Sequence, residues 1–187
     1  SLTRSEVIEK LDREGLLPAI TFIFSRNNCD AAVRQCLAAG IRLTNSQERS
    51  SIREVVAKNI KSLAEEDLVV LGYYEWADAL ERGVAAHHAG LLPAFKVTVE
   101  ELFQRGLIKA VFATETLALG INMPAKTVVL EKLVKYNGEA HVPITPGEFT
   151  QLTGRAGRRG IDIEGNAVIL WNNDLDSNSV GGLASTR

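Results

Sequence analysis

Short apolar runs rich in β-branched and aromatic residues recur along the chain, separated by longer segments in which apolar and polar residues are mixed. Four runs are clear, AITFIF at 19–24, IKAVFA at 108–113, KTVVLE at 126–131 and NAVILW at 166–171, and a weaker fifth candidate is VAAHH at 84–88. Their apolarity is nearly continuous rather than alternating, which is typical of parallel strands covered on both faces. The pattern therefore predicts a buried, mostly parallel sheet.

Helical patterns lie between the predicted strands, and their starts carry N-capping signals. The signals with suitable spacing are Thr3 with Glu6, Asn27 with Asp30, Ser51 with Glu54, and Thr145 followed by a proline at the first helical position. Because strand and helix alternate, the sequence predicts an α/β sandwich with right-handed crossovers and with function at the carboxyl ends of the strands. The least regular stretch, from 41 to 82, is predicted to be a helical excursion from the sheet.

The composition is that of a globular chain of 187 residues, with 45% hydrophobic and 24% charged residues, and this excludes general disorder. Cys29 and Cys36 are seven residues apart on one predicted helix, about 10 Å along its axis, which is too far for a disulfide. We therefore expect reduced core thiols and a cytoplasmic location. No stretch approaches 18 apolar residues, so no membrane-spanning helix is expected.

The most unusual string is QLTGRAGRRG at 151–160. If a helix continues through it, Gln151 and Arg155 lie on one face, and Arg158 follows one turn later. Guanidinium groups suit the oxygens of phosphates, and glycines let a ligand or another backbone approach closely. Taken alone, RxxR also fits a solvated, salt-bridged helix end.

Two further strings place polar residues where predicted strands end. In VFATETLALGINMPA at 111–125, hydroxyls and a turn containing Gly120 and Asn122 could form a small anion nest, although turn geometry alone also explains such residues. In AAHHAGLLP at 85–93, His87 and His88 should face opposite sides of a strand, which argues against a shared metal ion. One histidine is expected to pack inside, and the other, with Gly90, could meet a backbone phosphate.

The strings AITFIFSR, AAHHAGLLP, VFATETLALGINMPA and QLTGRAGRRG, in this order, resemble motifs IV, IVa, V and VI of superfamily two helicases. They are most similar to the Ski-type DExH RNA helicases and their bacterial HelY-type relatives, over residues 18–172. The resemblance implies the second RecA-like domain of a two-domain motor, an α/β three-layer sandwich with a mostly parallel sheet of about five to six strands and helices on both faces. This domain would occupy 1–172, followed by a polar linker at 173–187 towards further domains.

The resemblance also implies roles for individual residues. In that family the domain closes over ATP held by the first domain, supplies arginine fingers and grips the nucleic-acid backbone. Arg155 and Arg158 match the phosphate-facing arginines, while Gln151, Gly120 and Asn122 match nucleotide-binding positions. Positions that face the nucleic-acid strand are implied for Ser25, Arg26, His88, Gly90, Thr114 and Glu115.

Neither a GxxxxGK[ST] loop nor a DExH box occurs in the 187 residues. The resemblance therefore implies that ATP and Mg²⁺ are held mainly by the first RecA-like domain of the same full-length protein, and that this chain alone is inactive. The expected partner is single-stranded nucleic acid, with RNA implied by the resemblance. No metal site in the chain itself is expected.

Two alternatives are weighed against this interpretation. A nucleic-acid-binding module without motor function could use Arg26 and a stacking surface made of Tyr73, Tyr74 and Trp76. The YYEW string is better explained by packing of an inserted segment against the sheet, and a net charge of -2 gives no broad basic surface. A Rossmann-type enzyme is disfavoured because no GxGxxG follows the first predicted strand.

Overall fold

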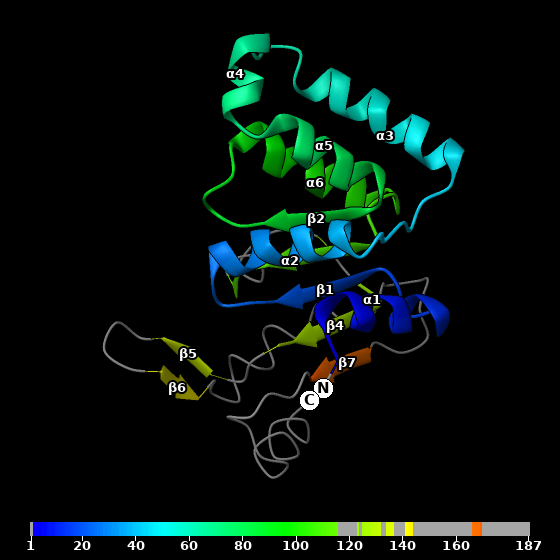
Figure 1. Cartoon of the computed structure of the whole chain (residues 1–187), viewed down its shortest axis with the longest axis vertical. Helices are drawn as coiled ribbons and strands as arrows, with labels where there is room; N and C mark the ends of the chain where they lie inside the picture. The colour runs from blue at the N-terminus through cyan, green and yellow to red at the C-terminus, as the bar shows by residue number, and fades with distance from the viewer. Residues whose placement is uncertain are drawn as a thin grey trace.

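The computed structural model describes residues 2–115, 123, 125–131, 134–136, 141–143 and 166–169. These residues include an all-parallel sheet of five strands in the order β2-β3-β1-β4-β7 (Figure 1). The strands are β1 (Ala19–Phe22), β2 (Val84–His87), β3 (Ala110–Ala113), β4 (Thr127–Leu130) and β7 (Asn166–Ile169). Each of the five apolar runs contains one of them, so the predicted parallel sheet is confirmed.

The described residues also form six helices and a small antiparallel pair of strands. The helices are α1 (Arg4–Arg13), α2 (Arg26–Ala38), α3 (Ser46–Asn59), α4 (Glu65–Val70), α5 (Tyr73–Glu81) and α6 (Pro93–Gln104). The antiparallel pair consists of β5 (Val134–Tyr136) and β6 (His141–Pro143). The expected excursion between 41 and 82 therefore holds three helices, α3, α4 and α5.

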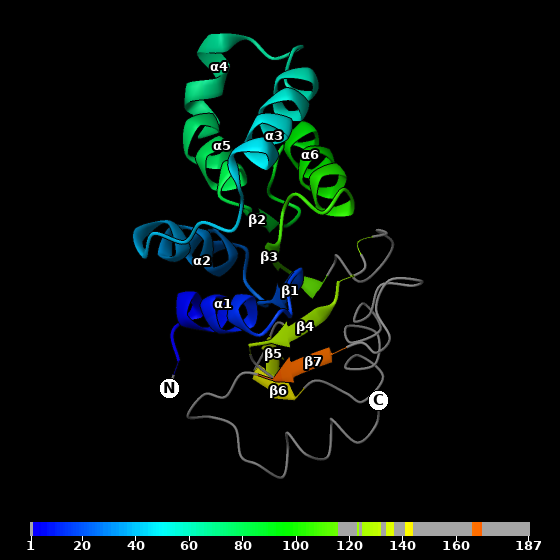
Figure 2. The same ribbon diagram turned by 90° about the vertical axis from the view of Figure 1, so that its right-hand side faces the viewer.

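Alternate residues of the sheet face two separate hydrophobic cores. Ile20 and Phe22 pack in one core with side chains of α3, α5 and α6. Ala19 and Phe112 pack in the other, mainly with side chains of α1 and α2. Figure 2 shows α1 and α2 along one side of the strands, and α3, α5 and α6 gathered beyond β2. Because the two cores hold alternate strand residues, helices contribute to both faces of the sheet, as expected for a RecA-like sandwich.

The helix starts test the capping signals. Thr3 and Glu6 form the predicted capping box, in which the Thr3 hydroxyl accepts from the Glu6 amide at 3.2 Å. The Asn27 signal is wrong, because α2 begins after Ser25, whose hydroxyl accepts from the amide of residue 28 at 3.2 Å. The backbone amide of Ile23 makes a final ladder bond to strand β3, so the chain leaves the sheet just before Ser25.

The Ser51 signal is also wrong, because Ser51 lies inside α3. This helix begins earlier, with a capping box between Asn45 and Glu48 whose two bonds measure 2.8 and 2.9 Å. The preceding segment is anchored, since the Leu43 amide donates to the carbonyl of Arg82 and the Thr44 hydroxyl donates to that of Glu81. The Thr145 signal lies outside the described residues.

Aromatic packing explains most of the YYEW string. The Trp76 ring stacks on Phe95 of α6, with centroids 3.9 Å apart and planes at 7°. Tyr73 packs against the same core, while Tyr74 stays exposed. Trp76 is packed as predicted, but the prediction of packing against the sheet is wrong for its ring, which stacks on a helix.

Cys29 and Cys36 are free and buried on α2, as predicted. Burial raises the pKa of each thiol to about 12, which keeps both protonated and unreactive at neutral pH. Within the described ranges, no helix has the length and apolarity needed to cross a membrane.

Candidate functional site

The carboxyl ends of three neighbouring strands meet at one edge of the sheet. In the register, Phe22 of β1 and His87 of β2 both pair with Ala113 of β3, so the three strands end at the same level. The residues that follow these β-strands include the six positions predicted to face the nucleic-acid strand. We call this group the carboxyl-edge cluster, and it comprises Ser25, Arg26, His88, Gly90, Thr114 and Glu115.

His88 is held inside the domain by both of its ring nitrogens. Nδ1 accepts from the Gly90 amide at 3.0 Å, and Nε2 lies 2.9 Å from Oδ1 of Asp30 on α2. Because Nδ1 accepts, we assign the ring hydrogen to Nε2, which donates to the Asp30 carboxylate. The imidazole is therefore committed to fixing the turn at 88–90 against α2, rather than offered to a ligand.

His87 faces the other side of the sheet, as the strand alternation predicts. Its Nε2 lies 2.6 Å from Oε2 of Glu100 on α6, and its Nδ1 is buried without a partner among the described residues. Only one histidine was expected to be buried, whereas His87 and His88 are 3% and 5% exposed. Each is buried because a helix covers its face of the sheet and supplies a carboxylate.

Gly90 lies tightly against the His88 ring. A Cβ atom at this position would lie 3.1 Å from two atoms of the His88 ring and 3.6 Å from Cδ of Arg26. A side chain would therefore require the His88 ring to shift by a few tenths of an ångström, whereas its contact with Arg26 would be an ordinary one. The same contacts place the exposed turn directly beside the first residue of α2.

The start of α2 combines a cation with unpaired backbone amides. Arg26 is exposed and makes no ion pair among the described residues, and the first turn of α2 contains no acidic residue. The first amides of a helix carry partial positive charge and favour an anion. Ser25 already uses its hydroxyl as the N-cap. This corner of the carboxyl-edge cluster is therefore suited to a phosphate group.

The end of β3 offers a buried hydroxyl and an exposed carboxylate. Thr114 is buried, and its amide donates to the carbonyl of His87 at 3.3 Å, which ties β3 to β2 beyond the regular ladder. Glu115 is exposed at the same edge. A carboxylate repels phosphate and accepts from hydroxyl groups, so Glu115 suits a sugar hydroxyl better than a phosphate oxygen.

A fork of hydrogen bonds fixes the edge at β4. Arg4 of α1 donates from Nε and Nη2 to the two carboxylate oxygens of Glu131, at 2.8 and 2.6 Å, and from Nη1 to Gln35 of α2 at 3.2 Å. The hydrogen bond with Glu131 raises the pKa of Arg4, although burial opposes it. This geometry joins α1, α2 and the end of β4 into one support for the edge.

The predicted nucleotide-facing residues lie outside the described residues. They are Gly120, Asn122, Gln151, Arg155 and Arg158. Among the residues that the structure does describe, no three His, Cys, Asp or Glu side chains gather as a metal site would require.

Sequence reasoning missed Asp30 and Glu100, the carboxylates that hold the two histidines. Asp30 is 58 residues from His88 and Glu100 is 13 from His87, so neither pair forms a motif of fixed spacing. The only available signal was the alternation that sends the two rings to opposite faces of the sheet.

Comparison with known proteins gives consistent matches. Residues 31–160 match the family described as the helicase conserved C-terminal domain. Over 98% of its length, the chain is 68% identical to the probable helicase HelY of Mycobacterium tuberculosis strain H37Rv. It is 46% identical over 89% of its length to the chloroplastic DExH-box ATP-dependent RNA helicase DExH15 of Arabidopsis thaliana. It is 40% identical over 90% of its length to the antiviral helicase SKI2 of Saccharomyces cerevisiae.

All three relatives are much longer than this chain. It spans 20% of the mycobacterial protein, 14% of the Arabidopsis protein and 13% of the yeast protein. The resemblance to Ski-type DExH helicases and their HelY-type relatives is confirmed, and it concerns one region of such proteins.

Proposed function

We propose that this chain, which belongs to the helicase conserved C-terminal domain family, works as the second RecA-like motor domain of an ATP-dependent RNA helicase. The observation that carries the proposal is the carboxyl-edge cluster, in which three parallel strands end side by side with polar residues. This is the edge where open α/β sheets bind their ligands. Relatives named as RNA helicases align with nearly the whole chain.

In this proposal the cluster contacts the backbone of a single RNA strand. Arg26 and the first amides of α2 would meet a phosphate, the turn at Gly90 would admit the strand closely, and Thr114 would border the same path. Glu115 would accept from a ribose 2′-hydroxyl, which distinguishes RNA from DNA. His88 would act indirectly, by holding the turn through Asp30 and the Gly90 amide. The contacts would be largely independent of base sequence.

In the same proposal, a first RecA-like domain would hold the nucleotide on the surface that faces this chain. Arg155 and Arg158 would stabilise the transferring phosphoryl group, and Gln151, Gly120 and Asn122 would contact the nucleotide. ATP and Mg²⁺ would be held mainly by groups outside these 187 residues, since no GxxxxGK[ST] or DExH string occurs in them. The chain alone is accordingly proposed to bind nucleotide weakly and to hydrolyse none.

The alternative of a nucleic-acid-binding module without motor function has less support. Its proposed stacking surface requires Trp76, and that ring is already stacked on Phe95 at 3.9 Å. Tyr74 alone remains exposed among the three aromatics, and the stretch around it is acidic rather than basic.

The test compares two arginines of the same helix in the full-length protein. Arg26 lies in the cluster, whereas the exposed Arg34 lies eight residues further along α2. We expect R26A to weaken binding of labelled oligouridine roughly three- to tenfold, and to reduce the log-log salt slope by about 0.7, the loss of one phosphate contact. R34A should change neither quantity. Equal effects of the two substitutions, or none from R26A, would contradict this strand path.

A further inference from the structure

The helices α4 and α5 carry a concentrated apolar surface. Six large hydrophobic residues are exposed among the described residues, and four of them fall within six positions of this segment. We call these four the α4–α5 patch, and they are Val69 at 65%, Val70 at 86%, Leu71 at 39% and Tyr74 at 59% exposure. Single exposed apolar side chains are common, but several within one short segment point to an interaction surface.

A cavity of about 220 Å³ adjoins this patch. It lies between α2, α5, α6 and the edge strand β2, and its wall includes the stacked rings of Trp76 and Phe95. Leu71 belongs to both the patch and the cavity wall. Leu71 therefore connects the patch with the rim of the cavity. A recess of this size is smaller than typical pockets for drug-sized ligands, and it suits an anchoring side chain.

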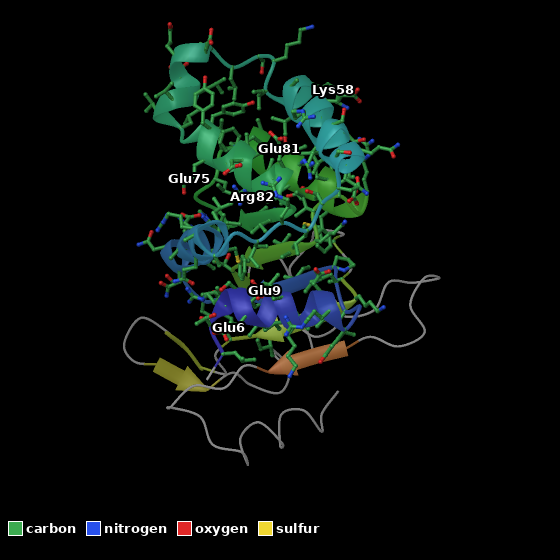
Figure 3. All side chains as sticks on the ribbon, turned by 45° about the vertical axis from the view of Figure 1, so that its right-hand side comes forward. Glu6, Glu9, Lys58, Glu75, Glu81 and Arg82 are labelled. Carbon is green, nitrogen blue, oxygen red and sulfur yellow. The ribbon has the colours of Figure 1, made fainter. Side chains whose placement is uncertain are left out.

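The surroundings of this surface are acidic. Residues 62–81 contain six carboxylates and no lysine or arginine. Asp78 and Glu81 pair with Arg82 and Arg53. The other four make no ion pair within the described part of the chain, and they are Glu65, Glu66, Asp67 and Glu75. Glu75 also lines the cavity, and Figure 3 shows it on the side of α5 that is turned towards α2.

This charge distribution narrows the choice of occupant. Four exposed carboxylates without cationic partners repel a nucleic-acid backbone and attract lysine or arginine. A second copy that met this surface with the same surface would bring these like-charged carboxylates together, which disfavours it. An amphipathic helix fits best, because its apolar stripe can cover the patch while its basic face meets the carboxylates.

We propose that the α4–α5 patch and its cavity bind a basic amphipathic helical segment of a partner protein. One large apolar side chain of the segment enters the cavity beside Trp76, and its neighbours cover Val70 and Leu71. Lysine or arginine on its flank pairs with Glu75 and with the carboxylates at the start of α4. This inference goes beyond the proposed motor function and does not depend on it, although the cavity wall shares Asp30 with the His88 contact of the carboxyl-edge cluster.

The probes are three labelled synthetic helices of about 15 residues, titrated into the full-length protein and followed by fluorescence anisotropy. The first carries leucine at helix-face spacing and lysine elsewhere, the second replaces lysine by glutamate, and the third replaces leucine by serine. We expect saturable binding of the first helix only.

Substitutions then locate the binding surface. E75K and V70S should each weaken binding of the leucine-lysine helix at least tenfold, and E75K should favour the glutamate helix instead. The matched control is E9K, which makes the same charge change at an exposed position of α1. All three positions are exposed, so folding should be preserved, and circular dichroism checks this.

Several outcomes would overturn the proposal. If E75K and E9K weaken binding of the leucine-lysine helix equally, the weakening comes from the change in net charge and not from this surface. Equal binding of the leucine and serine helices would remove the role of the apolar surface. Tighter binding of oligouridine than of the leucine-lysine helix at this surface, with sensitivity to V70S, would assign it to nucleic acid. Concentration-dependent self-association abolished by V70S would assign it to a second copy.

Discussion

Replacing Asp30 by alanine should loosen the turn that His88 holds. The substitution removes the acceptor for the Nε2 hydrogen of a side chain that is only 5% exposed, so a buried donor loses its partner. Such a loss costs about 1–3 kcal/mol. The Asp30 carboxylate is itself 40% exposed, and solvent weakens its share of the interaction. We therefore expect a decrease of about 1–1.5 kcal/mol in the free energy of unfolding.

D30A should also weaken RNA binding, because the Gly90 amide donates to the other nitrogen of the His88 ring. In D30A the turn at 88–90 would become ordered only on binding the RNA strand, so part of the binding free energy would be spent on ordering it. A cost of about 1–1.5 kcal/mol corresponds to roughly five- to tenfold weaker binding. D30N should restore most of the affinity, since its amide oxygen can still accept from Nε2.

Two measurements check this reasoning. Urea unfolding of the 187-residue chain reports the stability of D30A, and anisotropy of labelled oligouridine with the full-length protein reports its affinity. The double variant H88A/D30A should cost little more than H88A alone, because the two residues share one interaction. If D30A leaves both quantities unchanged, or D30N is as damaging as D30A, the hydrogen bond does not hold the turn.

The strands could be predicted because parallel strands bury both faces. In VAAHH the residues from Val84 to His87 are all buried, so even the weakest run carries the signal of a covered strand. The capping signals were less reliable, because a polar residue followed three positions later by an acidic one also arises by chance. Ser25 caps α2 because the chain leaves the sheet just before it, and Asn45 caps α3 because the loop before it is anchored. Both positions depend on tertiary contacts.

The sequence could predict that the candidate site lies at the carboxyl edge of the sheet, but not the contacts within the site. The ends of β1, β2 and β3 follow from the positions of the apolar runs, and the polar residues after them are visible in the sequence. The role of His88 depends on Asp30, and the limited space beside Gly90 depends on the His88 ring. Such contacts arise from packing between segments that are distant in sequence, and no local pattern records them.

Two further predictions concern Glu48 and Arg158. Burial opposes ionisation of Glu48, but hydrogen bonds from Lys109 and the Asn45 amide outweigh it and lower its pKa. Its contribution to stability is therefore present above the unfolded pKa, near 4.5, and is lost as the pH falls through the lower folded value. E48Q should lower the free energy of unfolding of this chain by about 0.5–1 kcal/mol at pH 7 and by nothing at low pH. The exposed control E9Q should show no such difference, and a pH-independent loss in E48Q would exclude the ion pair with Lys109 as its cause. For Arg158, which we propose reaches the transferring phosphoryl group only when two domains close, the benefit should fall on the transition state. R158A in the full-length protein should cut RNA-stimulated ATP turnover at least about a hundredfold while changing ATP affinity only a few-fold. Lysine should not rescue turnover, because a point charge cannot replace the planar guanidinium fork. Near-normal turnover in folded R158A would instead make QLTGRAGRRG a charged helix end with no part in phosphoryl transfer.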